Sequence, residues 1–330
     1  MAYRVLIIGC GAIAGGYDKD RSPDDWPLSH AGAITRDDRF ELAACVDPDE
    51  AAREAFAERW NVPVSAPCLD TLAAAPGDFD LIVIASPTNH HADQLEWALE
   101  MRPRAVFCEK PLAKNIATVE ALIGAYETAR IPLIVNYTRR WAPDLRGLAD
   151  SAARGEWGAL LSAVGTYGKG VVHNGTHMVD LLEMFVGPME VRAIGQAVID
   201  FWDDDPTVDA ILTAREWNEP VHLVSSDARA LTQFELVLNY ERGEIAMRDG
   251  GMRIETRRVV DSETFAGYRQ LGPVEAAPGR YVEAMRAAYD DLAGVIGGTG
   301  QPKPAPSNGF ATHAICEELR LAGLQQVEDQ

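Results

Sequence analysis

Two histidines and an aspartate are closely spaced in residues 173–180 of the chain. His173 and His177 are four residues apart, and Asp180 follows the second histidine by three. If this segment begins a helix, the three side chains lie on one face of it. Such a face could hold a metal ion, carry out acid–base chemistry, or form a buried polar cluster.

A metal site is the least favoured of these interpretations. Two histidines at this spacing form half of a zinc site, but Asn174 occupies the position where the metalloprotease motif has glutamate. The sequence offers no cysteine pair and no evident third histidine to complete a ligand set. We therefore predict proton chemistry and no metal.

The N-terminal residues indicate a cofactor with which these side chains could work. An apolar run, Tyr3–Ile8, leads directly into glycine-rich residues 9–16. A buried parallel strand followed by such a turn is typical of a dinucleotide fold. Gly9 would allow the tight turn and Gly11 the close approach of the pyrophosphate, and Ala12 and Ile13 continue the predicted cofactor loop. The GxGxxxG spacing is one residue longer than the usual fingerprint, and plain loops can also be rich in glycine.

Asp47 ends the second apolar run, Phe40–Val46. An acidic residue at this point of a dinucleotide fold binds the ribose 2′-hydroxyl and repels a 2′-phosphate. The sequence therefore predicts NAD in preference to NADP. The alternative is that Asp47 caps the helix predicted at Glu50–Trp60.

Strands and helices alternate through the first half of the chain, which indicates a doubly wound parallel sheet. Further strands are predicted at 80–85, 105–109 and 133–136, and helices at 92–101 and 115–130. Ligands of such sheets bind at the carboxyl ends of the strands. The residues expected to contact the cofactor at these ends are Ser86, Pro87, Thr88, Asn89, His91, Glu109, Lys110 and Asn136. For His91, packing at a helix N-terminus is an equal alternative.

Residues 17–29 separate the glycine-rich turn from the helix predicted at His30–Arg36. This stretch is polar and contains two prolines, so it is unlike a helix. We interpret it as an insertion, which could lie over the cofactor or substrate or could be a surface excursion.

The second half of the chain contains short strand-like runs of alternating polarity, separated by turn residues. They predict a mostly antiparallel sheet with one covered face, in an α+β domain. Turns are expected at 203–206, 218–220 and 241–243, and helices at 281–296 and 307–324. The predicted domains are therefore a dinucleotide-binding domain at 1–136 and a substrate-binding domain at 137–330.

Composition narrows the class of protein. With 47% hydrophobic and 24% charged residues the chain should fold, and its net charge of −20 argues against binding to nucleic acid or anionic membrane. Five cysteines without a pattern suggest a reducing compartment. No apolar run is long enough to span a membrane, and the N-terminal apolar core is too short for a signal peptide. We expect a cytoplasmic location.

Several motifs occur together in one order: the glycine loop, Asp47, Ser86-Pro87, Glu109-Lys110-Pro111, Arg140-Trp141-x-Pro143 and Gly175-x-His177-x-x-Asp180. In this combination the chain resembles the Gfo/Idh/MocA family of NAD(P)-dependent oxidoreductases over essentially its whole length. The resemblance implies an N-terminal Rossmann domain and a C-terminal domain with a large open sheet. It also implies a homodimer or homotetramer joined through that sheet, and sugar or cyclitol substrates and their conjugates.

The resemblance also assigns roles to particular residues. The family lysine corresponds to Lys110 and its catalytic histidine to His177. Four residues before that histidine the family commonly has aspartate, whereas this chain has His173. An imidazole can be neutral or charged near pH 7, so His173 could shuttle a proton or lower the pKa of a neighbour. Asp180 is expected to orient His177 or to cap structure.

Hydride transfer requires a base for the hydroxyl proton and a positive group for the developing alkoxide. We expect His177 to be the base and Lys110 the polarising group, with exchanged roles as the alternative. The other residues expected at the substrate are His173, Asn174, Arg140, Trp141 and Tyr167. For the two aromatic residues the alternative is a place in the core. Arg139 and Arg140 could bind a substrate phosphate or could equally pair with the abundant surface carboxylates.

The sequence therefore predicts an NAD-dependent sugar or cyclitol dehydrogenase. One alternative is an NAD-using glycosidase of the same fold, in which the cofactor would be recycled. Another is a non-catalytic NAD-binding sensor or repressor, although the presence of both Lys110 and His177 argues against it.

Overall fold

The computed structural model describes residues 2–214, 217–301 and 306–329. The chain divides into two compact units, a first unit of Met1–Thr138 with Val282–Phe310 and a second unit of Arg139–Tyr281 with Ala311–Gln330. The predicted division, after residue 136, assigned all later residues to the second domain. In the structure, the segment that begins at Val282 instead packs with the first unit.

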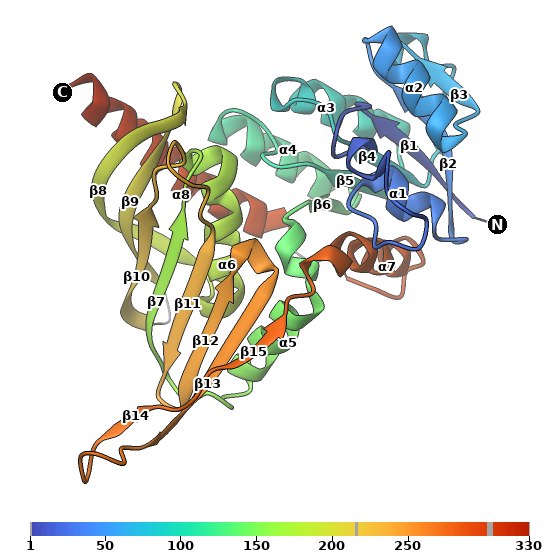
Figure 1. The fold of residues 1–330 in the computed structure, drawn as a ribbon. Coiled ribbons are helices and arrows are strands. Elements are labelled where there is room, and N and C mark those ends of the chain that lie inside the picture. Colours follow the sequence, from blue (N-terminus) through green and yellow to red (C-terminus); the bar gives the residue numbers. More distant parts are fainter. Residues whose placement is uncertain (1, 215–216, 302–305, 330) are drawn as a thin grey trace. The chain divides into compact units, whose positions relative to one another are not determined.

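The strands of the first unit form one sheet in the order β3-β2-β1-β4-β5-β6 (Figure 1). Neighbouring strands pair in parallel, and the order reverses between β1 and β4, as in a Rossmann dinucleotide fold. β3 was not predicted, because two of its three residues are exposed and it contains no apolar run. The strands are β1 Tyr3–Ile8, β2 Phe40–Val46, β3 Val64–Ala66, β4 Leu81–Ile84, β5 Ala105–Cys108 and β6 Leu133–Val135.

Helices cover both faces of this sheet. On one face, α3 (His91–Met101) and α4 (Ile116–Ala129) contribute Leu95 and Leu122 to a core that includes Ile84. On the other face lie α1 (His30–Thr35) and α7 (Ala284–Ile296), and the ring of Tyr289 packs edge-on against Phe107 of β5. α2 (Glu50–Trp60) connects β2 to β3. Tyr289 explains why the segment after Val282 belongs to this unit, since its ring is fully buried there.

Several helices begin at the residue types that favour such starts. The side chains of Ser29, Asp49 and Asn115 each accept a hydrogen bond from the backbone N–H three residues further on. This contact satisfies one of the N–H groups that the first turn of a helix leaves unpaired.

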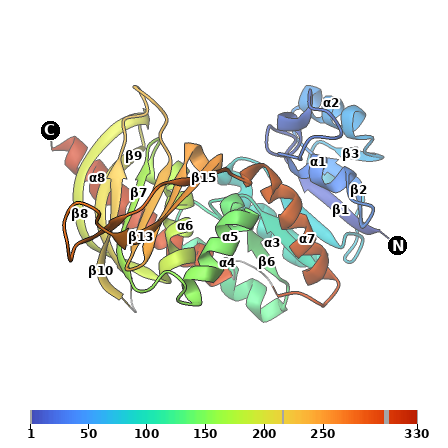
Figure 2. The same cartoon turned by 60° about the horizontal axis from the view of Figure 1, so that its bottom comes forward.

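The strands of the second unit form an open sheet in the order β14-β13-β12-β11-β7-β10-β9-β8, and β15 also pairs with β13 (Figure 1; Figure 2 shows the same sheet after a turn of 60°). The pairings are antiparallel except between β7 and β10. The predicted fold class, a Rossmann domain followed by a mostly antiparallel open sheet, is confirmed. The strands are β7 Leu160–Tyr167, β8 Met189–Trp202, β9 Asp205–Ala214, β10 Trp217–Ser225, β11 Glu235–Tyr240, β12 Gly243–Arg248, β13 Arg253–Asp261, β14 Arg269–Leu271 and β15 Glu275–Pro278.

Helices of the second unit pack on this sheet through glycines. A Cβ at Gly165 of β7 would lie 2.6 Å from Met178 of α6 (Thr176–Val186), so the missing side chain allows α6 to approach the strand. Gly323 of α8 (Pro306–Glu328) approaches Val208 of β9 in the same way. α5 (Pro143–Ala153) precedes β7 in the chain.

One predicted turn is wrong and another is right only in its first half. Asn218–Pro220 lie within β10, at a point where the register with β9 is irregular and a proline can be accommodated. Of the turn predicted at 203–206, residues 203 and 204 do form the turn between β8 and β9, whereas Asp205 and Pro206 begin β9. Within the described residues, no helix is both long enough and apolar enough to span a membrane.

Candidate functional site

Two glycines shape the turn that follows β1. Gly9 has a φ of +94°, and a Cβ there would lie 2.6 Å from the backbone nitrogen of Ser86. Any side chain at Gly9 would therefore clash with the end of β4. A Cβ at Gly11 would meet nothing within 4 Å, so the backbone is open to an incoming group at this position. These are the properties expected of the first two glycines of a pyrophosphate-binding turn.

Asp47 is bonded directly to this turn. Its Oδ2 accepts a hydrogen bond of 2.7 Å from the backbone N–H of Cys10, and its Oδ1 accepts one of 2.9 Å from that of Asp49. The helix-capping alternative for Asp47 is wrong, because the side chain of Asp49 caps α2 by accepting from Ala52. The carboxylate at the end of β2 is thus held beside the glycine-rich turn.

A cavity of about 750 Å³ opens at the carboxyl ends of β1 to β4. Of the predicted cofactor residues, Gly9, Gly11, Asp47, Ser86 and Pro87 line it. The part of its wall formed by residues 67–70 follows β3 and was missed with that strand. The described residues of the lining include four aspartates, at positions 47, 49, 70 and 93, and neither lysine nor arginine. The cavity is open, anionic and large enough for one half of a dinucleotide.

The remaining predicted cofactor residues, Ala12, Ile13, Thr88, Asn89, His91, Glu109, Lys110 and Asn136, do not line this cavity. Within η3 (Thr88–His90), it is His90 that faces the cavity. Ala12 and Ile13 contribute backbone carbonyls to the turn itself, which accept hydrogen bonds from Tyr17 and His30.

His91 is buried and joins two loops. One ring nitrogen lies 2.8 Å from the carbonyl oxygen of Ser86, and the other lies 2.8 Å from that of Pro111. Burial lowers the pKa of His91, although these two contacts oppose the shift. The contacts of His91 therefore agree with the alternative prediction, packing at a helix N-terminus. Its ring links the loop at Ser86 to the loop at Pro111.

Glu109 is the centre of a buried network that the sequence did not suggest. Its Oε1 lies 3.1 Å from Nε2 of His30 and accepts a 2.6 Å hydrogen bond from Nδ2 of Asn136. The other ring nitrogen of His30 lies 3.0 Å from the hydroxyl of Tyr289. Burial would raise the pKa of Glu109, but the contacts of His30 and Asn136 and the charge of Lys110 lower it overall. A carboxylate is thereby stabilised next to Lys110.

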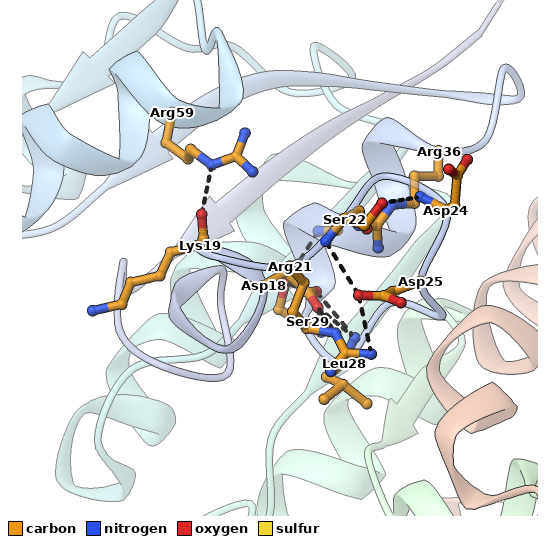
Figure 3. A network of polar contacts seen from close by, with 11 residues as sticks. Asp18, Lys19, Arg21, Ser22, Asp24, Asp25, Leu28, Ser29, Arg36 and Arg59 are labelled. Carbon is orange, nitrogen blue, oxygen red and sulfur yellow. Dashed lines mark hydrogen bonds and ion pairs between the residues drawn. The ribbon is translucent and has the colours of Figure 1, made fainter.

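Residues 17–29 position His30 through Asp18. The fully buried carboxylate of Asp18 accepts hydrogen bonds from the backbone N–H of Leu28 and from both the N–H and the hydroxyl of Ser29 (Figure 3). Ser29 in turn caps α1, whose first residue is His30. None of residues 17–29 lines the cavity at the glycine-rich turn. The hydrogen bonds within this insertion therefore fix the residue at which α1 begins.

In the second unit, His173 lies in the π-helical turn η5 (Val171–Gly175) and His177 in the first turn of α6. Asp205 holds this turn, since its two oxygens accept hydrogen bonds of 2.9 and 2.7 Å from the backbone N–H groups of Val172 and His173. Burial raises the pKa of Asp205 to about 6, although these hydrogen bonds oppose the shift. The sequence placed Asp205 in a surface turn and missed this role.

Asp180 and Arg140 form a buried ion pair. Nε of Arg140 lies 2.6 Å from Oδ1 of Asp180, and Nη2 donates to the backbone carbonyl of Asp180. Burial raises the pKa of Asp180 to about 6, and the charge of Arg140 opposes the shift. Of the two roles considered for Arg140, pairing with a protein carboxylate is the one present, although this carboxylate is buried rather than on the surface.

Trp141 and Tyr167, which were expected to stack on a sugar, are core residues. Their exposed fractions are 1% and 0%, and the Tyr167 hydroxyl is hydrogen-bonded to the backbone of Val208. A ring so enclosed has no face available to a ligand, so the alternative of core packing describes both residues.

A second cavity, of about 550 Å³, lies within the second unit. Its wall includes two predicted substrate residues, His173 and Asn174, together with Arg139, Lys169 and Phe234. The amide of Asn174 donates to the carbonyl of Gly168, which ties η5 to the end of β7. Among the described residues, no cluster of three or more histidine, cysteine, aspartate or glutamate side chains has the arrangement of a metal site.

Comparisons with known proteins agree with this architecture. Residues 3–137 match the Gfo/Idh/MocA family model, described as an oxidoreductase family with an NAD-binding Rossmann fold. Over 311 residues the chain is 26% identical to inositol 2-dehydrogenase of Rhizobium meliloti (strain 1021), a match that covers 87% of this chain and 91% of that protein. Over residues 3–137 the predicted resemblance to this family is confirmed.

Solved structures share the fold along nearly the whole chain. An oxidoreductase from Agrobacterium radiobacter in complex with NAD⁺, L-tartaric acid and magnesium has a TM-score of 0.74 at 16% identity, covering 98% of this chain and 97% of that one. A 3-ketoreductase from Actinomadura kijaniata in complex with NADP and TDP-benzene has a TM-score of 0.74 at 17% identity, covering 97% and 98%. Solved structures of this fold thus include complexes with either cofactor.

Proposed function

We propose that this chain, whose residues 3–137 match an NAD-binding oxidoreductase family, is a dehydrogenase or reductase acting on CH–OH groups. It would move a hydride between nicotinamide and a carbinol or carbonyl carbon of a sugar, cyclitol or sugar conjugate. The observation that carries the proposal is the cavity at the glycine-rich turn, where Gly11 leaves room for a pyrophosphate and Asp47 is held beside it.

NAD is the cofactor that this cavity favours. A ribose 2′-hydroxyl can donate to the carboxylate of Asp47, whereas a 2′-phosphate would be repelled by it. The other aspartates of the lining add to the repulsion, and the described lining has no lysine or arginine to offset it. The nicotinamide would supply the hydride acceptor or donor.

We assign the proton chemistry to Lys110 and His177. His177 acts as the base for the substrate hydroxyl, and Lys110 polarises the oxygen on which charge develops, or the two exchange these roles. The charge of Lys110 is one of the causes that lower the pKa of Glu109, which supports a role for Lys110 as the positive, polarising group. Asp180 is paired with Arg140, and it supports α6 rather than taking part in the reaction.

His173 and Asn174 are proposed to contact the substrate, since both line the cavity of the second unit. We further propose a cytoplasmic homodimer or homotetramer joined through the second sheet. The alternative functions remain an NAD-using glycosidase and a non-catalytic NAD-binding sensor.

Calorimetry with NAD⁺ and NADP⁺, followed by a spectroscopic assay of NADH formation with a panel of sugars and cyclitols, tests the proposal. We expect tighter binding of NAD⁺ and reduction of the cofactor by at least one polyol. Equal or tighter binding of NADP⁺ would contradict the role of Asp47. NAD⁺ binding without reduction by any polyol would favour the sensor, and cleavage of a glycoside without accumulation of NADH would favour the glycosidase.

A further inference from the structure

Arg139 is held rigidly in the wall of the second-unit cavity. Its guanidinium carbon lies 4.0 Å from the ring centre of Phe234 and 4.9 Å from that of Tyr281. Its Nε donates a 3.0 Å hydrogen bond to the carbonyl of Gly250. Two aromatic faces and one carbonyl therefore fix the plane of the guanidinium.

The two terminal nitrogens of this guanidinium, Nη1 and Nη2, make no hydrogen bond to the described part of the chain. Within the described residues, Arg139 also forms no ion pair. Burial lowers the pKa of Arg139, as expected for a cation that has lost water without gaining a carboxylate partner. The next residue, Arg140, differs in this respect, because its guanidinium is paired with the carboxylate of Asp180. Two adjacent nitrogens with free N–H groups form the fork that binds carboxylate or phosphate in a bidentate manner.

A second cation, Lys169, is presented by a turn with an unusual backbone. Lys169 has a φ of +65°, a conformation that non-glycine residues seldom adopt. Asp200 holds this conformation, because its Oδ2 accepts hydrogen bonds from the backbone N–H groups of Lys169 (2.8 Å) and Ala228 (3.1 Å). No ion pair to Lys169 is present in the described part of the chain. A strained residue kept in place at a cavity wall is a common feature of binding sites.

The carboxylates of this cavity do not neutralise the two cations. Glu235 lines it, but its Oε2 lies 2.7 Å from Nη1 of Arg248. Asp249 also lines it, and its Oδ2 lies 3.5 Å from Nε of Arg253. Each carboxylate thus has an arginine outside the lining as its partner. The cavity keeps two uncompensated positive groups on a chain whose net charge is −20.

We infer that this cavity recognises an oxyanion on the substrate, a carboxylate or a phosphate, with Arg139 as the bidentate anchor and Lys169 as the second contact. The inference rests on the proposed function and narrows its substrate class to sugar acids or sugar phosphates. The hydroxyls of a neutral polyol could accept hydrogen bonds from these cations, but they would supply neither a counter-charge nor the paired oxygens that match the fork.

Calorimetric binding to the NAD⁺-loaded protein at low salt provides the test. The probes are glucose and myo-inositol as neutral compounds, glucuronate as a carboxylate and glucose 6-phosphate as a phosphate. We expect one of the two anions to bind more tightly than either neutral compound, which also identifies the oxyanion. Arg139→Met and Lys169→Met should each weaken that binding by about ten- to a hundredfold, as expected for losing hydrogen bonds to a charged group. Arg139→Lys should restore only part of it, because the ammonium lacks the fork.

Arg154→Met and Lys19→Met are the matched controls, since these two cations are exposed and are not among the residues that line the cavity. Both controls should bind the anion as the unmodified protein does. Thermal unfolding of each variant identifies any that fails to fold. If Arg139→Met fails to fold, the binding measured with Lys169→Met still tests the site. Anion binding no tighter than that of the neutral compounds, or unchanged in both folded cavity variants, would overturn the inference.

The inference and the proposed function fail in different ways. Turnover of neutral polyols that is insensitive to both cavity substitutions would leave the dehydrogenase intact and remove the anion site. Anion binding that depends on Arg139 and Lys169, without hydride transfer to any sugar acid or sugar phosphate, would keep the site and remove the activity.

Discussion

Nε2 of His30 lies 3.1 Å from Oε1 of Glu109, although 79 residues separate them in the chain. The contact joins the start of α1 to the end of β5, and Tyr289 of α7 extends it on the far side of the imidazole. Because Glu109 precedes Lys110, the arrangement controls the charge beside a residue that we assign to catalysis. The predictions begin with this pair.

His30→Ala should destabilise the first unit and weaken catalysis. The substitution leaves Glu109 with the hydrogen bond from Asn136 as its main compensation for burial. Losing the partner of a buried charged group costs about 1–3 kcal/mol or more. We expect a lower urea midpoint and a fall in kcat greater than the change in KM for NAD⁺. His90→Ala, at an exposed position, is the control for stability, and a His30→Ala protein as stable as the unmodified one would refute the role.

Asp47→Asn should reduce the preference for NAD⁺ over NADP⁺. The amide oxygen can still accept from Cys10, while the negative charge that repels a 2′-phosphate is removed. We expect the ratio of the two dissociation constants to change by about tenfold, equivalent to about 1.4 kcal/mol. Calorimetry with both cofactors measures this ratio. Asp24→Asn, which also removes one negative charge but lies outside the cavity lining, should leave it unchanged.

Lys110→Ala and His177→Ala should each abolish most of the turnover while cofactor binding is retained. Removal of a general base or acid typically costs about 10²–10⁴ in rate. Steady-state kinetics with the best substrate of the panel, together with the Kd for NAD⁺, separates catalysis from binding. Full activity in both variants would show that the reaction uses other residues.

Arg140→Met should unfold the second unit more easily. It leaves the buried carboxylate of Asp180 without its cation, and breaking one partner of a buried pair costs about 3–5 kcal/mol. The double variant Arg140→Met/Asp180→Asn should recover much of that loss, because no uncompensated charge remains. Arg154→Met breaks an exposed pair with Glu156 and should cost less than about 1 kcal/mol. Equal losses of stability in Arg140→Met and Arg154→Met would contradict this account.

The stability of the Glu183→Gln variant relative to that of the unmodified protein should increase as the pH rises. Burial raises the pKa of Glu183 to about 7 from its ordinary value of 4.5, and Thr312 donates a hydrogen bond that opposes the shift. The folded protein therefore holds this proton where the unfolded chain has lost it, so its contribution to stability is present at low pH and is lost as the pH rises through about 7. Glutamine cannot ionise and avoids that loss.

Urea unfolding of the unmodified protein and of Glu183→Gln at pH 5 and pH 8 measures the effect. The difference between the two proteins should move in favour of the variant by about 2 kcal/mol from the lower to the higher pH, since each pKa unit corresponds to about 1.4 kcal/mol. Glu156→Gln, at an exposed position, serves as the control. A difference that does not depend on pH would exclude a raised pKa for Glu183.

The amino-acid sequence was sufficient to predict the fold and several residues that line the proposed cofactor cavity. Apolar runs and their spacing are local properties, so strands such as Tyr3–Ile8 and helices such as Glu50–Trp60 were predicted at their observed bounds. Gly9 and Asp47 were likewise recognisable from their positions after strands. β3 was missed because its three residues, of which two are exposed, are too few to form an apolar run.

Only the tertiary structure decided which polar groups are partners. Arg139 and Arg140 are adjacent and chemically identical, yet Asp180 occupies the second and no carboxylate of the described chain reaches the first. His30 is an ordinary residue in the sequence until folding places it against Glu109. Which cation is satisfied and which is left for a ligand depends on contacts between residues distant in the chain, because a charge is neutralised by whatever lies within a few ångströms of it.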